Sequence, residues 1–399
     1  MRVVAGLWFV AGLVAATPAM ALELTGSFGA EGRYFVEPAA YPGQERHDVS
    51  AFAEVEMHHP FGDHGITLTP FYRVDAADPE RTHFDLREGF VQLVSARAEL
   101  AVGIRQVFWG VTESQHLVDI VGQTDAVENV DGEDRLGQPM VQLTVPTPNG
   151  TLDLFALPYF RERTFPGAEG RLRGPFLVST DFTLYDHPDE ERHLDGAARY
   201  DFYAGPLEVA LSWFSGTSRD PILDPAVTCA ALGCPAGVLM PRYVTIDQGG
   251  LETQLILGDW IWKLEAIRRF GFGFTDYSAA TFGYEYTFPA VWGTYMDLGV
   301  LTEYMWDSRG SAATPFESDV MAGFRLAVND LGSTELLAGL IGDPDGEWGL
   351  FAEGSRRYGE HLRAELEVRL FGGSAANTPT PLYYLRRDDH LQLSLAWYF

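Results

Sequence analysis

The chain has 399 residues, a formal net charge of −28 and 13% aromatic residues. So negative a chain is a poor partner for nucleic acid, whose phosphates attract basic surfaces. Beyond the N-terminus no stretch approaches 18 consecutive apolar residues. This excludes a membrane-spanning helix but not a barrel, in which apolar and polar residues alternate along each strand.

The first residues have the features of an export signal. Arg2 supplies a positive charge, residues 3–16 form an apolar run, and Ala19-Met20-Ala21 has the small flanking residues of a cleavage site. The alternative is a membrane anchor, but the run is too short to span comfortably and no basic stop-transfer flank follows it. We therefore expect a signal peptide at 1–21 and an exported mature chain of 22–399.

From residue 24 onwards the dominant pattern is a period of two, which is typical of strands. The fourth candidate strand loses phase at Glu88-Gly89, where we expect a β-bulge. No inter-domain linker, repeat or low-complexity tract interrupts the pattern, so 22–399 is expected to form one domain. The predicted strands are 24–36, 48–60, 65–75, 82–96, 99–109, 139–147, 150–160, 194–204, 206–216, 243–257, 259–270, 276–288, 294–306, 317–329, 333–342, 347–357, 360–371 and 382–399.

The polar faces of these strands carry charges. In HLRAELEVRLF (361–371), apolar residues occupy one face, and histidine, arginine and glutamate occupy the other. A β-sandwich would have to bury such a face at a high desolvation cost, whereas a barrel exposes it to water in the lumen. The sequence therefore predicts an all-β fold, a single transmembrane antiparallel up-and-down β-barrel.

The connections provide a second test of that fold. After the second predicted strand every other link is short, as in FGDHG, TPNG and YGE. The links between them are mostly longer: 37–47, 110–138, 161–193, 217–242, 307–316 and 372–381. Bacterial outer-membrane barrels have short periplasmic turns and long extracellular loops. The alternation predicts an even strand number with both termini in the periplasm, about eighteen strands, or sixteen if one hairpin is misread.

The link at 111–138 does not alternate. Thr112 and Gln115 have the spacing of a capping box, and Leu117, Ile120 and Val121 follow at helical spacing, which predicts a short helix at 113–121. Residues 129–132 then predict a turn. An apolar stripe would be badly placed in solvent, so we expect this segment to fold inward against the barrel wall.

The chain has two cysteines, Cys229 and Cys234, in the sequence TCAALGCP. Their close spacing in an exported loop favours one local disulfide over two free thiols. A metal site would need further ligands, and none is near in sequence.

The last ten residues are HLQLSLAWYF. Leu393, Leu395, Trp397 and Phe399 lie on one face of this strand, and the chain ends on the aromatic residue. This ending resembles the assembly signal of Gram-negative outer-membrane β-barrels. With the export signal, the length and the loop alternation, the chain resembles porins and the substrate-specific eighteen-stranded channels, although no subfamily motif is matched.

The resemblance implies a location and a function. It implies a cell outer-membrane channel for passive diffusion of small hydrophilic solutes, with no cofactor. The implied partners are outer-membrane lipid and lipopolysaccharide, periplasmic chaperones and the barrel assembly machinery. Eighteen-stranded channels are often monomers, so a monomer is favoured. The rival interpretation is a non-conducting barrel that acts as a scaffold or as the outer component of an export or assembly system.

Two sets of residues are candidates for the channel's charge pattern. Arg105 is the expected charge partner of the inward-folded segment, because it precedes that segment on the lumen face. The expected pore constriction comprises Arg105, Glu113, His116, Asp119, Asp125, Glu128, Asp131, Glu133, Asp134 and Arg135. Lumen charges are expected at Arg87, Lys263, Arg325, Arg363, Glu365, Glu367 and Arg369. A slight acidic excess predicts a weak cation preference, unless most of these charges pair across strands.

The inward-folded segment allows three other interpretations. Ser114, His116 and Asp119 are the residue types of a hydrolase, but 114 and 116 point apart on a helix, so no catalytic site and no enzyme activity are expected. The acidic residues from 125 to 134 could bind calcium through their oxygens, although the spacing fails the EF-hand pattern. The third interpretation is a solvated acidic loop. No other metal site is expected.

Overall fold

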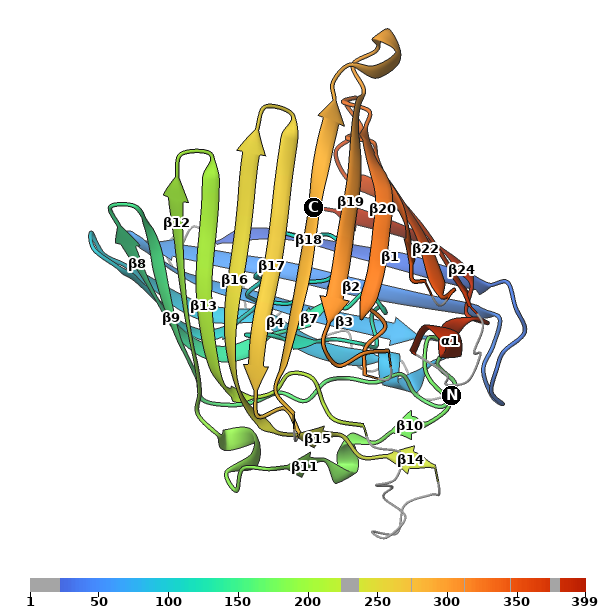
Figure 1. Cartoon of the computed structure of the whole chain (residues 1–399), viewed down its shortest axis with the longest axis horizontal. Coiled ribbons are helices and arrows are strands. Elements are labelled where there is room, and N and C mark those ends of the chain that lie inside the picture. The colour runs from blue at the N-terminus through green and yellow to red at the C-terminus, as the bar shows by residue number, and fades with distance from the viewer. Residues whose placement is uncertain (1–21, 224–236, 274, 312, 345, 374–380) are drawn as a thin grey trace, which may run out of the picture.

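The wall of the molecule is a closed ring of eighteen strands. The computed structural model describes residues 22–399 except 224–236, 274, 312, 345 and 374–380. Each wall strand pairs antiparallel with its neighbours in the chain, and β24 pairs with β1 to close the ring (Figure 1). The wall strands are β1 (Glu23–Phe35), β2 (His47–Phe61), β3 (His64–Asp75), β4 (His83–Val94), β5 (Glu99–Arg105), β8 (Gln138–Thr147), β9 (Gly150–Leu157), β12 (Asp195–Ala204), β13 (Leu207–Thr217), β16 (Thr245–Leu257), β17 (Trp260–Phe270), β18 (Tyr277–Phe288), β19 (Asp297–Asp307), β20 (Ser318–Ala327), β21 (Glu335–Gly342), β22 (Trp348–Tyr358), β23 (Leu362–Gly372) and β24 (His390–Tyr398).

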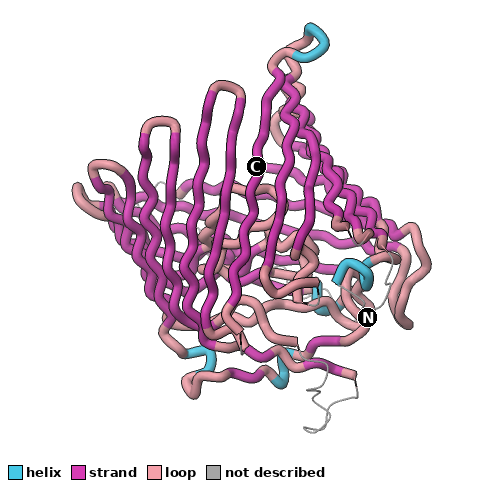
Figure 2. Tube along the Cα trace, in the orientation of Figure 1, coloured by secondary structure: helices cyan, strands magenta, loops and turns pink. Residues whose placement is uncertain are grey.

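The remaining elements are short and lie in the connections, as Figure 2 shows. One α-helix, α1, spans Pro381–Leu385, and no helix in the described part of the chain is long and apolar enough to cross a membrane. Single 3₁₀ turns occur at Pro79–Arg81, Thr180–Phe182, Glu190–Arg192 and Val291–Gly293. Among the described residues, six two-residue strands pair within or between loops: β6 (Gln123–Thr124), β7 (Arg135–Leu136), β10 (Leu177–Val178), β11 (Leu184–Tyr185), β14 (Val238–Leu239) and β15 (Arg242–Tyr243).

The predicted barrel and its eighteen strands are confirmed. The two largest boundary errors are in the fifth strand, which ends at Arg105 rather than 109, and in the last, which begins at His390 rather than 382; every other strand end lies within three residues of the prediction. The apolar residues after Pro381 form α1 instead, since proline fits the first turn of a helix. The bulge expected at Glu88-Gly89 is one residue earlier: Thr69 pairs with Glu88 and Pro70 with Leu86, so Arg87 is the extra residue.

Short turns gather at one end of the barrel and long connections at the other. In Figure 1 the tight β12–β13 and β16–β17 turns are at the top, and the connections that carry β10, β11, β14 and β15 are at the bottom. Two of these connections, 158–194 and 218–244, are joined by parallel pairs, β10 with β14 and β11 with β15. Pairing between such distant residues leaves no local sequence signal.

The alternation along each strand separates two surfaces. On β24 the outward Leu391, Leu393, Leu395 and Trp397 are 42–47% exposed, while the inward His390 is 1% exposed. Outward apolar residues recur around the whole ring, for example Leu211, Phe282, Val320 and Leu366. An exposed apolar band of this extent is stable only in contact with lipid or another apolar surface.

An arginine placed on the outward face should therefore cost far more than one placed on the inward face. Leu366→Arg, in the middle of β23, is expected to lower the free energy of unfolding in lipid vesicles by about 2–4 kcal/mol. The control is Ser355→Arg on the inward face of β22. Ser355 lies directly opposite Glu365 of β23, which can pair with the new arginine. Urea titration of both variants measures the difference, and equal costs would contradict the assignment of the two faces.

Candidate functional site

The connection from β5 to β8, residues 106–137, is bound to the inner wall. The Glu265 side chain on β17 accepts hydrogen bonds from the backbone N–H groups of Val111 (2.7 Å), Thr112 (3.0 Å) and Val118 (3.4 Å). It also accepts one from the Thr112 hydroxyl (2.7 Å). One buried carboxylate thus accepts hydrogen bonds from three backbone N–H groups of this segment.

A second carboxylate acts on the next residues. Glu303 on β19 accepts hydrogen bonds from the N–H groups of Glu113 (2.8 Å) and Ser114 (2.8 Å) and from the Ser114 hydroxyl (2.6 Å). Because these amides bond to the wall, the predicted helix at 113–121 is wrong: the segment is irregular. The Thr112 hydroxyl oxygen is also 2.6 Å from the carbonyl oxygen of Gln115, so its single proton is shared between that carbonyl and Glu265.

The apolar residues of the segment are buried. Val118 and Val121 have 0% exposure and Ile120 has 2%. They belong to a core cluster with residues of the segment's start and of the facing strands, including Trp109, Phe155, Ile246 and Ile267. The expected apolar stripe therefore exists, but in an extended loop rather than on a helix.

The far end of the segment binds arginines. The Arg73 guanidinium on β3 donates twice to the Glu128 carboxylate, at 2.9 and 2.6 Å. Arg33 on β1 donates to the Glu128 carbonyl (2.6 Å), and Arg81 donates to the Val127 carbonyl (3.0 Å). All three arginine side chains are nearly buried, at 4–6% exposure. Bidentate, charge-assisted bonds of this kind hold their partners strongly.

These two anchors are on nearly opposite sides of the barrel. Around the ring, β1 and β3 are the first and third wall strands, whereas β17 and β19 are the eleventh and thirteenth. A segment bound to both must cross the interior. On its return, Asp131 pairs with Arg369 on β23 (2.8 Å), and Arg135 pairs with Asp119 (2.6 Å) across the segment itself.

The crossing segment borders two cavities. The first, of about 490 Å³, extends to β21, β22 and β23, and the second, of about 480 Å³, is bounded by Arg87 and Phe108. His116, Glu133 and Arg135 line both, so these side chains stand between them. Burial and the nearby Arg135 charge lower the pKa of His116 to about 4, so the imidazole is neutral at pH 7.

The side of the first cavity that the crossing segment forms, here called its rim, is acidic, because Glu113, Asp119, Asp131 and Glu133 line it there beside Arg135. Glu113 pairs with Arg325 (2.7 Å), while Arg369 pairs with three carboxylates, Asp131, Glu353 and Glu367. Burial, and then repulsion from Asp131 and Glu113, raise the pKa of Glu133. Over the whole lining six carboxylates match six guanidinium groups, so the negative charge is concentrated on the segment's side of the cavity.

The other predicted charges have identified positions. Arg105 was expected to pair with the segment, and this is wrong: its guanidinium donates to Gln142 (2.6 Å) and lies over the Phe90 ring, because β5 ends there and its side chain turns along the wall. Asp134 is 3.9 Å from Arg87. Lys263 is 3.9 Å from Glu285, and Arg363 is 3.0 Å from Glu365.

The residues of the proposed assembly signal face outward. Leu393, Leu395 and Trp397 lie on the exposed face of β24, and Phe399 exchanges two backbone hydrogen bonds with Gly26. The predicted disulfide between Cys229 and Cys234 lies outside the described residues, as does the predicted signal peptide.

The hydrolase arrangement is not formed. Ser114 donates to Glu303, Asp119 holds Arg135, and the His116 Nδ1 atom is buried with no hydrogen-bond partner among the described residues. The acidic residues proposed for calcium also separate. Asp125 and Glu128 lie close together beside His83. Asp131 and Asp134 lie elsewhere, beside arginine partners. His83 was missed because it lies on β4, far from the segment in sequence.

Removing the acceptors on the wall should free the backbone of the crossing segment. In the Glu265→Leu/Glu303→Leu double variant, amide hydrogen exchange of 111–118 is expected to accelerate, because buried N–H groups lose their partners. Mass spectrometry of deuterated peptides measures this. The control is Glu285→Leu on β18, which faces Lys263. Unchanged exchange in the double variant would show that the carboxylates do not hold the segment.

Comparison with known proteins bears on the fold. No protein-family model matches the chain, and no curated protein matches it. Among solved structures it is similar to OccD3 (OpdP) of Pseudomonas aeruginosa, with a TM-score of 0.52 and 10% identity, over 94% of this chain and 90% of that one. A mutant of the Rhodopseudomonas blastica porin gives a TM-score of 0.45 and 11% identity, over 95% of this chain and 100% of that one. The likeness to OccD3 shows a shared barrel fold.

Proposed function

We propose that this chain is an outer-membrane channel for passive diffusion of small hydrophilic solutes, and that segment 111–138 forms its constriction. The proposal rests on one observation, which is that the segment runs from one side of the barrel wall to the other. It binds carboxylates on β17 and β19 and arginines near β1 and β3, so it crosses a barrel that would otherwise be wide enough for an aqueous channel. The exposed apolar band supports a location in lipid.

The lining of the interior supports a path for polar solutes. Inward positions carry charged side chains on β4, β17, β20 and β23, which is the composition of a hydrated lumen rather than of a dry core. The narrowest point of the proposed path is where His116, Glu133 and Arg135 separate the two cavities. Passive diffusion through such a path requires no cofactor.

The proposal includes the chain's handling in the cell. A signal peptide at 1–21 would direct export, and periplasmic chaperones and the assembly machinery would read the C-terminal Leu393, Leu395, Trp397 and Phe399. The mature barrel would contact lipid and lipopolysaccharide. A non-conducting scaffold is the competing outcome, and a planar-bilayer recording of the purified barrel separates the two.

Deleting part of the crossing segment should widen the pore. A variant lacking 113–134 is expected to show severalfold higher single-channel conductance in a planar bilayer, because the side chains that separate the two cavities are removed. The control lacks 187–190, at the exposed tip of another connection. Heat-dependent migration on gels verifies that both variants fold as barrels. Equal conductance of the 113–134 variant and the intact chain would refute the constriction.

The acidic rim should make the channel weakly cation-selective. Neutralising Asp131 and Glu133 as Asp131→Asn/Glu133→Gln is expected to shift the reversal potential in a salt gradient towards anion preference, because rings of one sign select the opposite ion. Arg325→Gln, on the facing wall, should shift it the other way. Identical reversal potentials in all three proteins would show that the rim does not select ions.

A further inference from the structure

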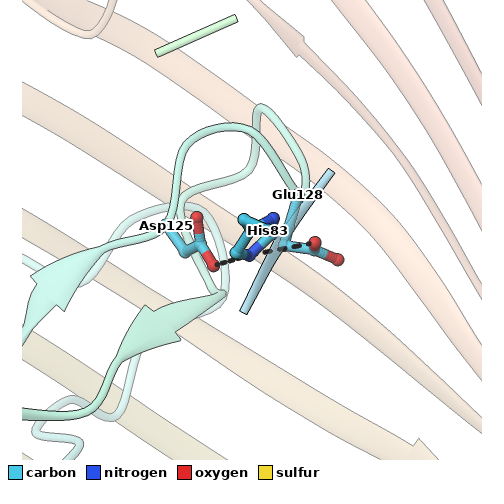
Figure 3. A group of neighbouring side chains, drawn as sticks. All are labelled: His83, Asp125 and Glu128. Carbon is cyan, nitrogen blue, oxygen red and sulfur yellow. Dashed lines mark hydrogen bonds and ion pairs between the residues drawn. The ribbon is translucent and has the colours of Figure 1, made fainter. Parts of the chain in front are cut away.

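A histidine and two carboxylates converge where the crossing segment meets β4. Figure 3 shows His83 pointing between Asp125 and Glu128. The His83 Nε2 atom is 3.1 Å from the Asp125 Oδ2 atom and 3.7 Å from the Glu128 Oε1 atom. The side chains are 16%, 1% and 5% exposed, respectively, so water screens the group poorly.

The hydrogen bonding of His83 is incomplete without a further positive charge. Its Nδ1 atom is 3.0 Å from the Arg81 carbonyl oxygen, which can only accept, so Nδ1 carries the proton of a neutral ring. The Nε2 lone pair then faces two carboxylates that also only accept. Either a second proton or a cation must lie between Nε2 and these oxygens.

The surrounding charges leave room for a divalent cation. Ion pairs link the three residues to a buried network with two more carboxylates than guanidinium groups. Its carboxylates are Glu31, Asp48, Asp75, Asp125 and Glu128, and its guanidinium groups are Arg33, Arg73 and Arg81. Arg87, the next arginine along β4, is paired with Glu54 and Asp134. A buried excess of carboxyl groups is costly unless protons or a cation neutralise it.

We propose that His83, Asp125 and Glu128 bind a divalent transition metal of the zinc class. One nitrogen and two oxygens suit such an ion, whereas calcium prefers six or more oxygens. Zinc bonds of about 2.0–2.1 Å in a tetrahedron place ligand atoms about 3.3 Å apart. The observed separations of 3.1 and 3.7 Å bracket that value, and the three ligand atoms all lie within 4.8 Å of one another.

Each proposed ligand is oriented by a second group. The Arg81 carbonyl accepts from His83 Nδ1, the Thr164 hydroxyl donates to Asp125 Oδ1 (2.8 Å), and Arg73 donates to Glu128. Metal ligands are usually held in this way by outer hydrogen bonds. Because His83 belongs to the wall and the carboxylates to the crossing segment, the ion would fasten that segment to β4.

The test measures binding of Zn²⁺ alone to the full-length barrel, in a Cys229→Ser/Cys234→Ser background that removes thiol ligands. The protein is stripped with a chelator, dialysed and titrated calorimetrically with zinc chloride. One Zn²⁺ per chain is expected to bind saturably. His83→Gln and Asp125→Asn should each weaken this binding by more than about 10-fold. Losing a metal ligand weakens binding at least as much as losing a group that hydrogen-bonds to a ligand.

The control variant is His187→Gln. His187 lies near His193 in an outer connection, where it could bind zinc adventitiously, so this variant should retain the high-affinity site. X-ray absorption of the zinc-loaded parent should show imidazole scattering, a readout that needs no variant to fold. Zinc binding equally tightly to His83→Gln and its parent, or a spectrum without imidazole, would overturn the proposal and leave His83 as a protonated partner of Asp125.

Discussion

The interior of this barrel is organised by hydrogen bonds from the backbone of one loop to two wall carboxylates. Glu265 and Glu303 accept N–H groups of residues 111–114 and 118, which would otherwise be buried without partners. Because the acceptors are fixed on the wall, the loop cannot form its own helix or extend outward. The apolar side chains beside these amides then pack against the wall, and the two cavities follow from that course.

At the opposite anchor, near β1 and β3, the roles of hydrogen-bond donor and acceptor are exchanged between wall and loop. There the wall supplies the donors, through Arg33, Arg73 and Arg81, and the loop supplies acceptors at Val127 and Glu128. Removing one member of such a buried set is more damaging than replacing the whole set with apolar residues, since the remaining charge loses its compensation. The loop is thus held across the interior by bonds to both sides of the wall, and its Glu113, Asp131 and Glu133 line the first cavity.

Much of the wall could be predicted from the sequence, because side-chain alternation is a local property. Side-chain alternation predicted all eighteen wall strands. Its interruption at Glu88 predicted the bulge within one residue of Arg87. The interior was harder. The capping pattern at Thr112 predicted a helix that does not form, because the competing acceptors on the wall lie more than 150 residues away in the sequence. The contacts of Arg105 depend on where β5 ends, and those of His83 depend on the crossing segment reaching β4. Residue spacing in the sequence reveals neither.

In the proposed channel the path is narrowest beside Glu133, which lines both cavities. The most direct measurement is the single-channel current of Glu133→Cys, with Cys229 and Cys234 replaced by serine, before and after a bulky thiol-reactive cation is added. We expect a stepwise fall in current on modification and no change for Asp189→Cys at an exposed loop tip. An unchanged current in fully modified Glu133→Cys channels would contradict the account.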